Sequence, residues 1–254
     1  MREILYGRNA VRESLRARRR QAFRLLLIEN IKPAPVITEI TDMARRHNVP
    51  VHQTTRKELD RLATGHQGVA LEVSQYPTVA VDDILQHAAG LNEPPFVVVL
   101  DHLEDPNNLG AILRSAEIVG AHGAIIPRQR AAKITPAAVN ASAGAAEHLL
   151  VADVPNLVQT LKQLKAQNIW VAGLENLPQA MPHHRANLGG ALAVVVGSEG
   201  AGLSRLTAET CDFLVKLPMR GQVESLNASV AAALLLYEVW RSRGFESDLT
   251  AASS

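Results

Sequence analysis

The sequence predicts an α/β protein of two domains, a small α/β domain over residues 1–75 and a larger one over residues 79–246. Short apolar runs alternate with segments of helical periodicity, which is typical of a parallel sheet whose strands are joined by helices. The run Phe96–Leu100 is apolar at every position, as expected of a strand buried on both faces. The stretch Ser74–Thr78, which contains Pro77, is the predicted linker.

In the small domain, helices and strands are predicted to alternate. The expected helices are Asn9–Arg18 and Pro35–Arg46, and the expected strands are Phe23–Ile28, Pro50–Gln53 and Gly68–Val73. A further helix should begin after Thr55, because Thr55 and Glu58 have the spacing of a capping box, and it should stop at Gly65.

Charge is unevenly distributed along a chain whose net charge is only +1. Arg8, Arg12 and Arg16 recur every four residues, so on a helix they form one basic stripe, which Arg19 or Arg20 would continue. Such a stripe suits a phosphate backbone. A solvated helix face is the equally good alternative.

In the larger domain, four apolar runs follow Phe96–Leu100 as further strands. These are Ala124–Ile126, Ile169–Leu174, Ala191–Val196 and Phe213–Leu217, with helices expected over Asn108–Val119 and Val154–Ala166. The last predicted helix, Leu226–Arg243, is apolar nearly all round. Such a helix is expected to be buried on most sides, within its own domain, against a partner subunit, or both.

Composition excludes several classes of protein. The single cysteine, Cys211, excludes an intrachain disulfide and a cysteine-rich zinc site, and favours a reducing cytoplasm. No apolar run reaches the length of a membrane span, and the N-terminus lacks the apolar stretch of a signal peptide. The pair His183-His184 has no cysteine or acidic ligand nearby, so no metal is expected.

Three segments carry candidate chemistry, and each follows a predicted strand. They are Asp101–Ser115, Val194–Ser204 and Leu217–Val230. Because the carboxyl ends of parallel strands meet at one edge of a sheet, the three segments should converge there. The second is rich in glycine, but it fits neither a phosphate-binding loop nor a dinucleotide fingerprint, and Glu199 in it would repel phosphate. A carboxylate there suits a cationic or hydroxyl-bearing ligand.

Structural roles compete with functional ones in these segments. Asn108 would serve as a helix N-cap, and Ser225 or Asn227 would do the same for the last helix. Arg114 lies off the predicted buried stripe and could be a surface arginine paired with Glu117.

The segments DPNNLGAILRSAE, VVVGSEGAGLS and LPMRGQVESLNASVAAAL resemble, in order and spacing, the three motifs of the SpoU or TrmH family of RNA ribose 2′-O-methyltransferases. The resemblance spans about Phe96 to Trp240. The segments LYGRNAVRESL and HQGVALEV resemble the substrate-binding domain of the RlmB-like branch, which is similar to kink-turn-binding ribosomal proteins.

The resemblance implies a SPOUT-type catalytic domain with a deep trefoil knot, binding of S-adenosylmethionine, and a homodimer formed through the C-terminal helix. It places the cofactor at Gly197, Glu199, Gly202, Leu217, Met219 and Leu226. It places the catalytic positions at Asn108, Arg114, Glu199 and Asn227. Arg114 would be either a general base, which is unusual for a guanidinium, or a fixed charge that stabilises the developing oxyanion.

The expected activity is therefore methylation of a ribose 2′-hydroxyl, on a guanosine of 23S ribosomal RNA by the RlmB resemblance. The candidate RNA contacts are Arg8, Arg12, Arg16, Arg128 and Arg130, and the expected compartment is the cytoplasm. Two alternatives stay open, a transfer RNA substrate and a non-catalytic RNA-binding ribosome-assembly factor on the same fold.

Overall fold

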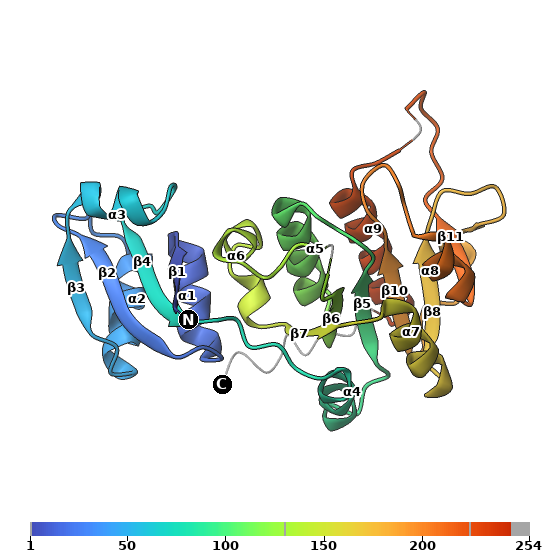
Figure 1. The fold of residues 1–254 in the computed structure, drawn as a ribbon, viewed down its shortest axis with the longest axis horizontal. Coiled ribbons are helices and arrows are strands. Elements are labelled where there is room, and N and C mark those ends of the chain that lie inside the picture. The colour runs from blue at the N-terminus through green and yellow to red at the C-terminus, as the bar shows by residue number, and fades with distance from the viewer. Residues whose placement is uncertain (1, 130, 224, 245–254) are drawn as a thin grey trace. The chain divides into compact units, whose positions relative to one another are not determined.

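A computed structural model describes residues 2–129, 131–223 and 225–244 of the chain. These residues divide into two compact units. The first consists of residues 2–78 together with residues 105–114 and 132–149, and the second contains the other described residues. Figure 1 shows the course of the chain through both. The predicted fold class, a parallel-sheet α/β domain with a small α/β domain at the N-terminus, is confirmed.

Within its described residues, the first unit holds a four-stranded sheet of order β1-β4-β2-β3. The strands are β1 (Arg2–Tyr6), β2 (Ala22–Ile28), β3 (Val51–Thr54) and β4 (Val69–Ser74). β4 pairs antiparallel with β1 and with β2, while β2 and β3 are parallel. The sequence did not reveal β1, because its first residues are charged and it becomes a strand by pairing with β4, which is distant in sequence.

The helices of the first unit pack against this sheet and against one another. They are α1 (Arg8–Ala17), α2 (Pro35–Arg46), α3 (Arg56–Leu62), α6 (Pro136–Ala141) and the 3₁₀ turn η1 (Ala145–Glu147). The capping box of Thr55 and Glu58 is confirmed at the start of α3. α3 ends at Leu62, earlier than the predicted Gly65. It ends there because Ala63 is extended and the chain turns back to bring His66 within 2.9 Å of Asp60.

A buried ion pair lies where α1 leads into β2. The side chain of Arg20 is fully buried, with Nη1 2.6 Å from Oε2 of Glu3 and Nε 3.0 Å from Oε1 of Glu147. Glu147 is also fully buried. Burial raises the pKa of the Glu147 carboxyl, and the charge of Arg20 opposes that shift.

The expectation that Arg19 or Arg20 continues the basic stripe of α1 is therefore wrong. The helix ends at Ala17, and the left-handed conformation of Arg18 (φ 54°) redirects the chain. Arg19 then donates to the hydroxyl of Tyr76 at 3.0 Å and to the carbonyl of Leu149. Both arginines stabilise the fold of the first unit.

The described part of the second unit holds a seven-stranded sheet of order β7-β6-β5-β10-β8-β11-β9, with every pair parallel. The strands are β5 (Phe96–Leu100), β6 (Gly123–Pro127), β7 (Leu150–Val154), β8 (Trp170–Leu174), β9 (Met181–Pro182), β10 (Leu192–Val196) and β11 (Phe213–Lys216). The five predicted strands are all present. The edge strands β7 and β9 were not predicted.

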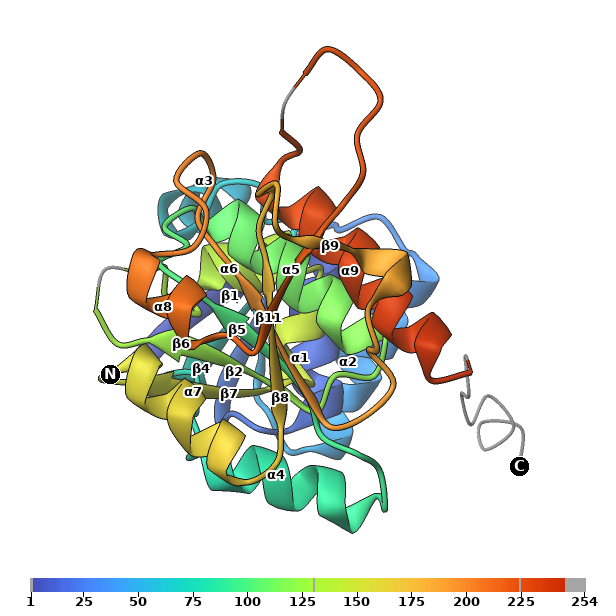
Figure 2. The same cartoon turned by 90° about the vertical axis from the view of Figure 1, so that its right-hand side faces the viewer.

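Helices cover both faces of this sheet. They are α4 (Val81–Gly90), α5 (Pro106–Ile118), α7 (Leu157–Ala166), α8 (Arg205–Thr210), α9 (Ala228–Ser242) and the 3₁₀ turn η2 (His183–Arg185). One core cluster joins Ile84 of α4 and Leu161 of α7 to Val97, Val99 and Val195 of the sheet. Figure 2 shows α5 and α9 on the opposite face. The first residues of α5 belong to the first unit and its last residues to the second.

The C-terminal helix α9 is buried along one face only. Ala232, Leu235, Leu236 and Val239 are fully buried. Val230, Leu234 and Tyr237, spaced at four and three residues, are 48%, 50% and 44% exposed. The expected burial of this helix on most sides is thus not achieved within one chain. In the described residues, no helix combines the length and apolarity that a bilayer crossing requires.

Candidate cofactor and catalytic site

The candidate site lies at one edge of the seven-stranded sheet. β5, β10, β8 and β11 are consecutive neighbours and run parallel, so their carboxyl ends meet at that edge. The residues that follow these strands are Asp101, Gly197, Glu175 and Leu217. The loops of the second and third predicted segments, which follow β10 and β11, therefore leave the same edge of the sheet with β8 between them.

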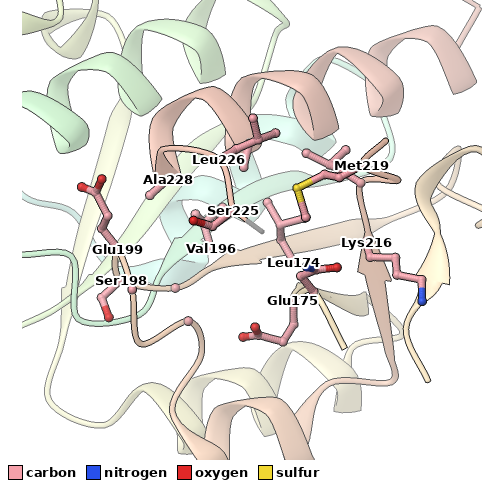
Figure 3. Close-up of a pocket in the computed structure, with 16 residues that line it drawn as sticks. Leu174, Glu175, Val196, Ser198, Glu199, Lys216, Met219, Ser225, Leu226 and Ala228 are labelled. Atoms are coloured by element: carbon pink, nitrogen blue, oxygen red, sulfur yellow. The ribbon is translucent and has the colours of Figure 1, made fainter. Parts of the chain in front are cut away.

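A pocket opens among the loops that follow β8, β10 and β11 (Figure 3). Its walls include Leu174, Glu175, Asn176, Val196, Gly197, Ser198, Glu199, Gly200, Gly202, Lys216, Leu217, Met219, Ser225, Leu226, Ala228 and Ala231. All six residues expected to hold a cofactor are among them. Several walls are apolar, while backbone groups, two carboxylates, one lysine and the side chains of Asn176, Ser198 and Ser225 supply polarity. Such a mixture suits a ligand with a flat apolar part and a charged part.

The loop after β10 is a tightly closed turn. The N–H of Ser198 donates to the carbonyl of Gly202 at 3.0 Å, and the N–H of Gly202 donates back to Ser198 at 3.0 Å. Gly202 has φ 67°, a left-handed conformation that favours glycine. A Cβ atom there would lie 2.3 Å from Oε2 of Glu175, so any side chain at this position would displace that carboxylate.

Carboxylates from two other strands hold the residues after this turn. Oε2 of Glu175, which follows β8, accepts the N–H of Leu203 at 2.8 Å. Oδ2 of Asp101, which follows β5, accepts the N–H of Ser204 at 2.7 Å and is almost completely buried. Sequence reasoning missed both roles, because a lone acidic residue after a strand gives no signal of its partner.

The structure brings two of the four predicted catalytic residues together. Nδ2 of Asn227 lies 3.4 Å from Oε1 of Glu199. Asn227 is also the N-cap of α9, because its Oδ1 accepts the N–H groups of Ser229 at 2.9 Å and Val230 at 3.3 Å. The N-cap holds the amide in one orientation, so its nitrogen is directed to Glu199.

The other two, Asn108 and Arg114, lie on α5. Asn108 is buried and Arg114 is exposed, off the predicted stripe of Leu109, Ile112 and Leu113, which is buried. The N-cap role considered for Asn108 is wrong, because Asp105 caps the helix. Its carboxylate accepts the N–H of Asn107 at 3.0 Å and that of Asn108 at 3.3 Å.

Gly110 explains how closely this part of α5 approaches its neighbour. A Cβ atom at Gly110 would lie 2.6 Å from the carbonyl oxygen of Ala138 and 2.6 Å from Cβ of Ala141, both in α6. The glycine of the first motif thus lets α5 and α6 pack backbone to backbone.

Each predicted RNA-binding arginine that the structure describes has a partner within the protein. In α1, Nε of Arg12 lies 2.7 Å from Glu13, and Arg16 forms ion pairs with Glu13 and Glu39. Arg8 donates to the backbone carbonyl of Gln67 at 3.4 Å.

In the second unit, Arg128 is exposed and its Nε lies 3.4 Å from Asp153. Arg130 lies outside the described residues. The acidic partners reduce the net positive charge of the stripe on α1.

Two families match the chain over successive segments. Residues 95–237 match the SpoU rRNA Methylase family, and residues 4–79 match the family described as RNA 2′-O ribose methyltransferase substrate binding. Among curated relatives, YacO of Bacillus subtilis, named as a TrmH family tRNA/rRNA methyltransferase, is 45% identical over 95% of this chain and 96% of its own. A Staphylococcus aureus relative with the same family name is 42% identical over 94% and 96%.

Solved structures share the fold. The SpoU methyltransferase AviRb from Streptomyces viridochromogenes, in complex with the cofactor AdoMet (S-adenosylmethionine), superposes with a TM-score of 0.79 at 24% identity, covering 96% of this chain and 92% of that one. An AdoMet-bound rRNA methyltransferase from Sinorhizobium meliloti gives 0.77 at 22% identity, with 94% and 87% covered.

Proposed function

Because the chain belongs to the SpoU rRNA Methylase family, we propose that it transfers a methyl group from S-adenosylmethionine to the ribose 2′-hydroxyl of a guanosine in 23S ribosomal RNA. One observation carries the proposal. The loops after β8, β10 and β11 form a pocket that includes all six expected cofactor residues, in a chain whose N-terminal segment matches an RNA 2′-O ribose methyltransferase substrate-binding family.

The pocket residues fit S-adenosylmethionine. Apolar side chains such as Leu217, Met219 and Leu226 offer a surface for the adenine, and the backbone of Gly197 and Gly202 forms part of the pocket wall. When bound, the cofactor supplies a methyl group already activated by its attachment to a sulfonium. The protein then has only to hold the ribose oxygen in line and to handle its proton.

We assign those tasks to Asn108, Arg114, Glu199 and Asn227. Asn227, fixed by its capping role, holds Glu199, and this pair positions the ribose. Arg114 acts on the 2′-hydroxyl in one of two ways. It takes the proton as a base, or it stays charged and stabilises the developing negative charge on the oxygen. The second role agrees better with the high pKa of a guanidinium.

We further propose that Arg8, Arg12, Arg16, Arg128 and Arg130 contact the RNA backbone. The ion pairs of Arg12 and Arg16 must then be exchanged for phosphate contacts, which makes binding depend on salt. A homodimer through α9, a trefoil knot in the catalytic domain and a cytoplasmic location complete the proposal. The exposed apolar stripe of Val230, Leu234 and Tyr237 supports the dimer.

The proposal is tested by incubating the protein with methyl-labelled S-adenosylmethionine and either ribosomal or transfer RNA, and then mapping the labelled nucleotide. Label on a ribose of a 23S guanosine is the expected result. Label in transfer RNA would show that the substrate is tRNA, the other class of RNA in the relatives' names. RNA binding without any label would favour the alternative of a non-catalytic assembly factor.

A further inference from the structure

Glu175 occupies a distinctive place in the pocket. It follows β8 and lines the pocket (Figure 3). One of its oxygens, Oε2, accepts the N–H of Leu203 at 2.8 Å. The resemblance to known methyltransferases assigned it no role. Its carboxylate is therefore both a support for the turn after β10 and part of the surface that a ligand meets.

A hydrogen bond and close packing hold the carboxylate in place. It packs against Gly202 so closely that a Cβ atom at that glycine would be 2.3 Å from Oε2 and 2.8 Å from Oε1. Glu175 cannot swing out of the pocket without giving up its bond to Leu203. A charge fixed in this way interacts with a ligand at no further cost of ordering the side chain.

The charges around Glu175 favour a cationic ligand. Among the described residues that line the pocket, the acidic side chains are Glu175 and Glu199 and the basic one is Lys216. The ammonium of Lys216 donates to the carbonyls of Leu177 and Pro178, at 3.2 and 3.0 Å. Glu199 is exposed and accepts from Asn227.

Glu175 is more buried than Glu199 and lies beside apolar Leu174. In surroundings of low polarity a fixed carboxylate attracts a positive charge more strongly than it would in water.

We propose that Glu175 is the anionic contact for the positively charged end of the cofactor and makes the pocket selective for a cationic ligand. S-adenosylmethionine carries two positive groups, a sulfonium and an α-ammonium, and one negative group, the α-carboxylate. Its demethylated product, S-adenosylhomocysteine, keeps the ammonium and the carboxylate, and 5′-methylthioadenosine has none of the three. The proposal concerns binding alone and rests on the cofactor proposed above.

The test is isothermal titration of these three ligands into wild-type protein and the Glu175→Gln variant. Glutamine keeps the size of the side chain and an oxygen that can accept the N–H of Leu203, but it removes the charge. We expect the Kd of S-adenosylmethionine to rise roughly tenfold, as for the loss of a charge-assisted contact. The Kd of 5′-methylthioadenosine should stay within about twofold.

Asp101→Asn is the matched control. Asp101 accepts the next N–H of the same loop, from Ser204 at 2.7 Å, but is not part of the pocket wall. Neutralising Asp101 should leave the ratio of the affinities for S-adenosylmethionine and 5′-methylthioadenosine unchanged. Glu175→Asp, which keeps the charge, should retain the preference for S-adenosylmethionine and serves as a second variant if glutamine impairs folding.

Each outcome decides the matter. If S-adenosylhomocysteine weakens as much as S-adenosylmethionine, the ammonium is the partner of Glu175; if it is unaffected, the sulfonium is. Equal weakening of all three ligands would show a purely structural role and overturn the proposal, as would an equal change of the affinity ratio in Asp101→Asn. Failure of the wild-type protein to bind S-adenosylmethionine would instead refute the proposed function.

Discussion

Replacing Arg20 by methionine should destabilise the first unit severely. The side chains of Arg20 and Glu147 are both 0% exposed and 3.0 Å apart, so the change leaves a carboxylate buried without its cation. Removing one partner of a buried pair costs about 3–5 kcal/mol. The pair of Arg16 and Glu39 has side chains 45% and 34% exposed, and Arg16→Met should cost only about 0–1 kcal/mol.

Hydrogen exchange measured by mass spectrometry gives the assay, because it reports the opening of β2 and η1 separately from the second unit. A loss of about 3–5 kcal/mol corresponds to an opening roughly a hundred- to a few thousand-fold more frequent. The double variant Arg20→Met with Glu147→Leu should recover much of the protection, since an apolar pair of similar volume replaces the ion pair. Protection in Arg20→Met equal to that in Arg16→Met would refute the reasoning.

The same variant should lose stability as the pH rises. Burial already raises the pKa of Glu147, and loss of Arg20 raises it further. Above the ordinary carboxyl pKa, the unfolded chain has released this proton while the folded chain retains it. Stability therefore falls by about 1.4 kcal/mol per pH unit until the folded pKa is reached. Exchange corrected for its intrinsic rate at pH 5 and pH 8 measures this slope, and a variant more stable at pH 8 would contradict it.

Three further predictions concern the second unit and α5. Arg114→Ala should abolish methyl transfer while folding and cofactor binding persist, because the residue is exposed. Partial activity in Arg114→Lys would favour the fixed-charge role, and near-normal turnover in Arg114→Ala would disprove the assignment. Leu234→Glu should convert a dimer to a monomer in sedimentation velocity, since Leu234 is 50% exposed on the apolar stripe of α9. An active wild-type monomer at micromolar concentration would exclude the dimer. Gly202→Ala should weaken cofactor binding at least tenfold in titration, because its Cβ would meet Glu175. Gly190→Ala, where the new Cβ has open space, should leave cofactor binding unchanged. Equal cofactor affinities of the two variants would show that the turn adapts.

Periodicity predicted most of the second unit because its strands are long apolar runs. β5 and β10 are buried at all five positions, so every residue contributes to the signal. β1 and β9 were missed because both lie at sheet edges. β1 contains charged residues, and β9 has only two residues. In α1 the spacing of the arginines was correct, but spacing carries no information about Glu39, the acidic partner of Arg16 that comes from α2.

The site was predictable to the extent that it depends on motifs. Gly197, Leu217 and Leu226 all line the pocket, as the motif resemblance implied. Glu175 was not found, because its role comes from the neighbouring turn of another strand. The N-cap role weighed for Asn108 as the alternative to a catalytic one belongs to Asp105, since both residue types cap helices and only the backbone shows which one does.

The grouping of residues 132–149 with the N-terminal elements has a consequence for how the chain can be cut. Tyr76, inside the predicted linker, has its hydroxyl 2.8 and 2.7 Å from the carbonyl oxygens of Ala146 and Leu149, and Arg19 donates to Pro77 at 3.3 Å. A protease that cleaves beside Pro77 would break the chain into two fragments that stay bound to each other. The shorter fragment would still be held by α6 and η1, so a nicked protein should elute intact until denatured, and exchanging the N-terminal domain between relatives would require transplanting residues 132–149 with it.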